Sequence, residues 1–98
     1  MSNTIQKLKS FLTTNQPALS DKEIELWVEL YALTRQQQQF ALAVLPLLQT
    51  LSPDLAAQAQ QIIALDTLLR RTKGKLLTYV AHIKNPTLRH TLLEIIQQ

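Results

Sequence analysis

The densest cluster of side chains that could do chemistry is the basic run Arg70-Arg71-Thr72-Lys73-Gly74-Lys75. The basic excess of the chain, whose formal net charge is +3, lies in this C-terminal half. Arginine and lysine side chains bind nucleic acid by neutralising phosphates and releasing counterions. The sequence therefore offers six candidate phosphate contacts, namely Arg70, Arg71, Lys73, Lys75, Lys84 and Arg89.

The spacing of the polar side chains in this region predicts a basic helix face. A continuous helix places residues four, three and four apart on one side, pointing away from its apolar side: Arg71, Lys75, Thr78 and His82. The alternative is an ordinary solvated surface that pairs with the acidic stripe Asp21, Glu25 and Glu29. Because charge runs are usually surface features, the alternative is favoured.

Catalytic, metal and cofactor sites are not expected. The chain has no Cys and one Gly, which excludes thiolate ligands and a glycine-rich phosphate loop. His82 and His90 lie eight residues apart with Pro86 between them, and neither has an acidic residue at a convincing ligand spacing. Zinc sites need three or four such ligands. We therefore expect a non-enzymatic protein that holds no metal and no cofactor.

Three local signals mark where helices begin. Ser20-Asp21-Lys22-Glu23 is a capping box, in which the Ser20 hydroxyl and the Glu23 carboxylate satisfy each other's backbone N–H groups. Ser52-Pro53-Asp54 and Asn85-Pro86 each place a capping side chain directly before a proline at the first helical position. A further short helix, over about 3–14, is expected to end before Pro17.

Two apolar stripes repeat at seven-residue intervals. The first heptad stripe comprises Leu26, Leu33, Phe40 and Leu47, with Leu30, Gln37, Val44 and Leu51 between them. The second heptad stripe comprises Leu55, Ile62, Leu69, Leu76 and Ile83, supported by Leu65 and Val80. Such spacing is typical of helices that pack on other helices. The stripes predict two long helices, over about 21–51 and 53–84.

Two helix-breaking residues lie inside these predicted helices. Pro46 lacks a backbone donor and clashes with the carbonyl of Leu42, so a kink or a break is expected there. The second heptad stripe keeps its phase across Gly74, which favours a continuous helix at a cost of about 1 kcal/mol relative to Ala. The alternative is a turn at 72–74 with Gly74 as a C-terminal cap.

These elements predict one all-α domain over residues 1–98. The two long helices fold about Ser52 into an antiparallel hairpin, and short helices at both chain ends pack near its open end. The stripes then face each other and pair Leu26 with Tyr79, Leu33 with Thr72, and Phe40 with Leu65. Polar residues in or near the stripes, Gln37 and Asp66, are expected to set the register.

Six further residues are candidate contacts to a protein partner, namely Trp27, Tyr31, Phe40, Leu42, Leu45 and Leu48. Trp27 and Tyr31 suit an anchor patch, although core packing against the first helix is the favoured alternative. The segment from Phe40 to Leu48 is apolar nearly all round, so one neighbouring helix cannot cover it. A second copy of the chain is the simplest cover, which predicts a dimer or a higher oligomer.

The expected function is thus a non-enzymatic protein–protein interaction module that associates with itself or with another helical protein. The alternative is an accessory nucleic-acid-binding protein that uses the basic C-terminal half. The two differ in salt dependence, because phosphate contacts weaken steeply with salt whereas apolar burial does not. We expect a cytoplasmic protein without membrane contact, because no apolar run is long enough to span a bilayer.

Overall fold

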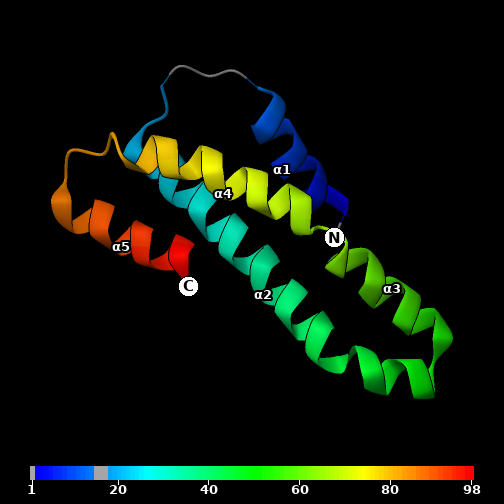
Figure 1. Cartoon of the computed structure of the whole chain (residues 1–98). Helices are drawn as coiled ribbons and strands as arrows, with labels where there is room; N and C mark the ends of the chain where they lie inside the picture. The colour runs from blue at the N-terminus through cyan, green and yellow to red at the C-terminus, as the bar shows by residue number, and fades with distance from the viewer. Residues whose placement is uncertain (1, 15–17) are drawn as a thin grey trace.

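The described part of the chain folds into five helices and no strands. The computed structural model describes residues 2–14 and 18–98. The helices are α1 (Ser2–Thr13), α2 (Asp21–Leu51), α3 (Pro53–Ile63), α4 (Asp66–Val80) and α5 (Pro86–Gln97) (Figure 1). The prediction of an all-α fold built on an antiparallel hairpin is confirmed, with α2 as one arm and α3 followed by α4 as the other.

The predicted helix starts hold the elements in place. The Ser20 side chain accepts from the backbone N–H of Glu23, and the Glu23 carboxylate accepts from Ser20, so the capping box of α2 is complete. Ser52 alone joins α2 to α3, and its hydroxyl accepts from the N–H of Leu55. The side chain of Asn85 caps α5. Helix α2 continues through Pro46 to Leu51, so the proline does not break it.

The second arm of the hairpin differs from one straight helix over 53–84. It bends at Ala64 and Leu65, where the helix is interrupted and the ψ of Leu65 is 5°, outside the helical region, and α4 ends at Val80. At the bend the side chain of Gln38 donates a hydrogen bond of 3.1 Å to the carbonyl of Ile63. Side chains that reach into a helix ladder are a common cause of such bends. Gly74 lies inside α4 without a positive φ, so the expected continuity there is confirmed.

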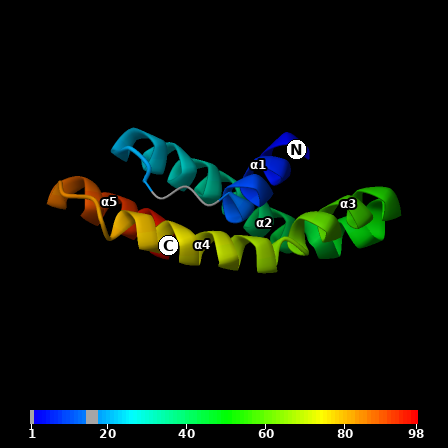
Figure 2. The same ribbon diagram turned by 90° about the horizontal axis from the view of Figure 1, so that it is seen from above.

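The hydrophobic core lies at one end of the hairpin. Helix α1 packs on α4 and α2, and α5 packs on α2 and α4 (Figures 1 and 2). The clustered core side chains come from all of these helices and from the segment after α4: Leu8, Phe11, Ile24, Val28, Tyr31, Leu69, Leu76, Val80, Ile83, Leu92 and Ile96. Residues 36–63, which we call the hairpin tip, extend beyond α1 and α5 as a pair of helices.

Much of the first heptad stripe is exposed, so its predicted burial between the two arms is wrong. Leu26, Leu33 and Phe40 are 56%, 58% and 69% exposed, so the burial predicted for them across the hairpin is not found. The buried side of α2 carries Ile24, Val28 and other residues that α1 and α5 help to cover. Because α2 is apolar on two opposite sides, its periodicity alone does not select the buried one.

The second heptad stripe is buried where α1 and α5 cover it and only partly buried on α3, where they do not. Leu69, Leu76, Val80 and Ile83 lie in the core, as predicted. On α3, Leu55 is 49% exposed and Ile62 is half-buried. The pattern therefore identifies the core-facing side of α4 correctly, but it does not reveal that the core ends at the bend.

The molecule is long and thin, measuring 50 × 25 × 17 Å with a radius of gyration of 15.2 Å. A compact domain of this length has a radius of gyration of about 12.6 Å. Its accessible surface is 6596 Å². A typical folded monomer of the same mass exposes about 5,700 Å². No helix within the described ranges is long and apolar enough to cross a membrane.

Candidate functional site

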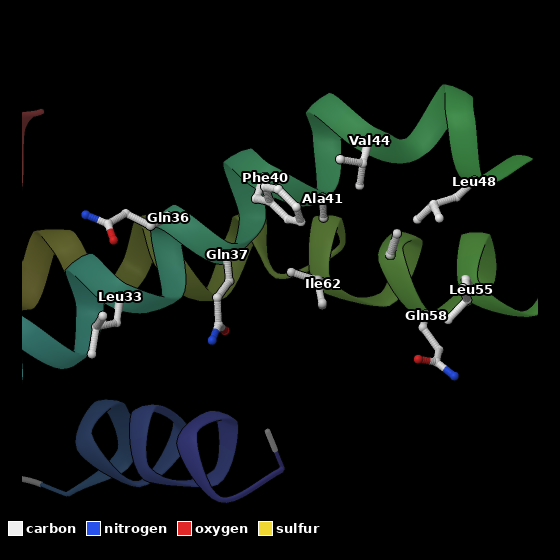
Figure 3. A pocket seen from close by; sticks show the side chains of 11 residues that line it. Leu33, Gln36, Gln37, Phe40, Ala41, Val44, Leu48, Leu55, Gln58 and Ile62 are labelled. Carbon is white, nitrogen blue, oxygen red and sulfur yellow. The ribbon is translucent and has the colours of Figure 1, made fainter.

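An apolar groove of about 520 Å³ runs along the hairpin tip between α2 and α3. Figure 3 shows the side chains that line it. From α2 these are Leu33, Gln36, Gln37, Phe40, Ala41, Val44 and Leu48, and from α3 they are Leu55, Gln58, Ala59 and Ile62. The groove thus combines part of the first heptad stripe with the start of the second.

Small side chains between the two helices shape this groove. Ala41 on α2 and Ala56 and Ala59 on α3 are buried, which lets the two backbones approach closely. The larger side chains Phe40 and Leu55 stand at the sides and are 69% and 49% exposed. The result is a hollow with a small-residue floor and bulky apolar walls, a shape that accepts the side chains of a packed helix.

The apolar surface continues beyond the groove. Leu47 and Leu51, at the end of the first heptad stripe, are 60% and 70% exposed, and Leu26 continues the stripe toward the start of α2. Monomeric proteins seldom expose so many large apolar side chains side by side, and such patches commonly mark interaction sites.

The hairpin tip is almost free of charge. Asp54 is the only ionisable side chain in residues 36–63, and the polar groups that line the groove are the amides of Gln36, Gln37 and Gln58. The centres of protein–protein interfaces are depleted in charged residues in the same way. The groove therefore suits an apolar, uncharged partner surface.

The six predicted partner contacts divide between the core, the groove and the opposite side of α2. Tyr31 is 3% exposed and belongs to the core, so its predicted role as a surface anchor is wrong. The Trp27 ring stacks on Phe11 of α1, with 4.7 Å between ring centroids. Trp27 therefore matches the alternative of packing against the first helix, and Tyr31 packs in the core.

The other predicted contacts lie on the hairpin tip. Phe40 and Leu48 line the groove. Leu42 is 51% exposed but lies about 200° around the helix from Phe40, on the opposite side of α2. Leu45 is half-buried. Sequence reasoning assigned to the intramolecular packing six further residues that line the groove or stay exposed or half-buried beside it: Leu26, Leu33, Leu47, Leu51, Leu55 and Ile62.

Two of the candidate phosphate contacts are engaged inside the molecule. The Lys75 ammonium donates to the carbonyls of Phe11 and Thr14, the latter at 2.7 Å, and lies 4.8 Å from the centroid of the Phe11 ring. Arg89 donates to the carbonyl of Ile83 at 2.7 Å. Lys75 thus closes the C-terminal end of α1, and Arg89 holds the connection between α4 and α5.

The remaining basic side chains do not form one face. Arg71 lies in a hollow beside Lys9 of α1, whereas Lys73 lies with Arg35 and Arg70 in another hollow. Arg70 also forms an ion pair with Asp66, and Lys84 is exposed after α4. Within the predicted basic stripe, Lys75 is half-buried against α1, whereas Arg71, Thr78 and His82 are exposed.

Pairing between the acidic stripe and the basic run is also not found. Within residues 2–14 and 18–98 the side-chain ion pairs are Arg70–Asp66 and His90–Glu94, each within one helix. The acidic stripe of Asp21, Glu25 and Glu29 takes part in neither. In the same ranges, no three His, Cys, Asp or Glu side chains come together in a way that could hold a metal ion.

The chain matches no protein-family model, no curated protein and no solved structure.

Proposed function

We propose that this chain is a cytoplasmic, non-enzymatic protein–protein interaction module that docks through the groove of the hairpin tip and the adjoining first heptad stripe. The observation that carries the proposal is a heptad-spaced apolar stripe that stays exposed after folding, from Leu26 to Leu51. Helices with this spacing bury it against other helices. The partner is therefore a helical surface of the same apolar and uncharged character.

The distribution of the basic residues favours this proposal over nucleic-acid binding. A phosphate-binding surface gathers Lys and Arg side chains on one face. Here Lys75 and Arg89 bond to backbone carbonyls, and Arg71 and Lys73 lie in separate hollows. Binding to a polyanion remains a prediction of the alternative, and steep salt dependence would be its signature.

The proposal is tested by placing a photo-cross-linking amino acid at position 40 in the native cells. Phe40 lines the groove, so irradiation should join the chain to its partner and produce a discrete band of higher mass. Position 42 is the matched control, because Leu42 is also exposed but lies on the opposite side of α2. A chain that forms no adduct from position 40, or equal adducts from both positions, would contradict docking through the groove.

A further inference from the structure

We infer that the partner of the hairpin tip is a second copy of this chain, held antiparallel so that the two tips form a four-helix bundle. This inference rests on the proposed docking surface and names its occupant. Each copy contributes α2 and α3, which form a single layer of helices at the tip. Stable domains bury such a layer against another one.

The amount of exposed surface fits one partner copy. The accessible surface of 6596 Å² exceeds that of a typical monomer of this mass by about 900 Å². A standard protein–protein interface buries about 800 Å² on each partner. Docking one second copy on the tip therefore brings the exposed surface of each chain close to that of an ordinary folded protein.

The polar chemistry of the tip favours a copy of itself. A twofold axis brings equivalent surfaces together, so a charged surface meets its own charge, whereas a glutamine amide donates and accepts and can pair with an identical amide. The groove is lined by Gln36, Gln37 and Gln58 and by no charged side chain. Two tips can therefore meet without like-charge repulsion.

The flanking charges select the antiparallel arrangement. Glu29 lies one turn from both Leu26 and Leu33, so a parallel pairing of the stripes would bring the Glu29 carboxylates of the two copies together. An antiparallel pairing keeps the two Glu29 carboxylates far apart instead. Helix α1 also flanks the start of the stripe, because Lys7 lies in the same hollow as Leu26. The overlap therefore centres on Phe40 to Val44.

Whether a second copy docks on the hairpin tip is tested by measuring the mass of the purified chain by light scattering over a micromolar concentration series. We expect twice the monomer mass of 11.2 kDa. Phe40→Glu places a charge in the dimer core and should raise the dimer dissociation constant at least a hundredfold, while Leu42→Glu should leave it within a few-fold. Circular dichroism establishes that both variants fold. A wild-type chain that stays monomeric at high micromolar concentration overturns the inference.

The orientation is tested with single cysteines, which are unambiguous because the chain has none of its own. Val44→Cys chains should be joined to each other by a short bis-maleimide, whereas Leu26→Cys chains should not, because an antiparallel pairing holds their labels far apart. Efficient joining through Leu26→Cys, or none through Val44→Cys in a dimer, overturns the antiparallel arrangement. If the purified chain is monomeric but position 40 cross-links to another protein, the docking surface stands and the second copy is excluded.

Discussion

Lys75 shows how the environment decides the role of a basic residue. Its ammonium bonds to the carbonyls of Phe11 and Thr14 at the end of α1, where helix carbonyls lack intrahelical donors and the helix dipole favours a cation. The same side chain lies over the Phe11 ring. Lys75 was predicted from the sequence to contact phosphate, but in the structure its hydrogen bonds connect α4 to the end of α1.

This role predicts a stability effect. Lys75→Met keeps the aliphatic stem but removes the charged donor, so the free energy of unfolding should fall by about 1–2 kcal/mol. Chemical denaturation measures the loss. Lys73→Met is the matched control on the same helix, since Lys73 lines a hollow formed by residues of α2 and α4 and not of α1, and it should change stability much less. Equal effects of the two substitutions would argue against the tie between α1 and α4.

Gly74 offers a second test at a single residue. It lies inside α4 with φ in the ordinary range, and an added Cβ meets nothing within 4 Å. Gly74→Ala should therefore raise the free energy of unfolding by about 0.4–1 kcal/mol, because it restricts the unfolded chain without straining the folded one. A rise in the thermal midpoint is the expected reading, and a clear fall would mean that the residue caps a helix rather than continuing one.

At the scale of elements, local chemistry could be predicted and the choice between helix faces could not. The capping box at Ser20, the Ser52 turn and the Asn85 cap are local signals, and all three start helices as expected. Helix α2, however, carries one apolar side through Ile24 and Val28 and another through the first heptad stripe. Which side is buried depends on where α1 and α5 pack, and that information lies elsewhere in the chain.

The two apolar sides of α2 also limit how much of the candidate site could be predicted. Phe40 and Leu48 were identified as contacts because their segment is apolar all round, and both line the groove. Leu33 and Leu55 were missed because a heptad stripe is equally compatible with packing inside one chain and between chains. The bend between α3 and α4 falls at Ala64 and Leu65. Neither residue is a helix breaker such as glycine or proline, so the sequence gives no local signal of the bend.

Gln38 links the two arms of the hairpin at this bend, so substituting it tests whether this link stabilises the bend. Its amide donates to the carbonyl of Ile63 and is nearly buried. Gln38→Ala leaves that carbonyl without this donor, so the free energy of unfolding should fall by about 1–2 kcal/mol. Gln39→Ala is the control, because Gln39 is an exposed neighbour on the same helix and the change in helix propensity is identical. Equal free energies of unfolding for the two variants would mean that the Gln38 hydrogen bond does not stabilise the bend.

For the whole molecule, the structure divides into a packed end and a thin end. The large buried side chains of the core come from α1, the first part of α2, α4, α5 and the segment after α4. In the tip the buried apolar residues among those described are alanines, namely Ala41, Ala56 and Ala59. Regions with few buried apolar contacts open locally at a lower free energy than the core does. A single copy should therefore have a tip that opens more readily than the packed end.

This division predicts how amide hydrogen exchange responds to protein concentration. In a dilute sample the amides of residues 40–60 should exchange much faster than those of Val28 or Leu76, which are fully buried. As the concentration rises, docking stabilises the closed tip by mass action, so exchange of its amides should slow while exchange at the packed end stays nearly constant. Mass spectrometry of peptic fragments measures both ends in one experiment, with the packed end as internal control. Phe40→Glu should abolish the concentration dependence. If the tip amides exchange equally fast at every concentration, no second copy covers them. If exchange slows equally at both ends, the chain is stabilised in general and not by docking at the tip.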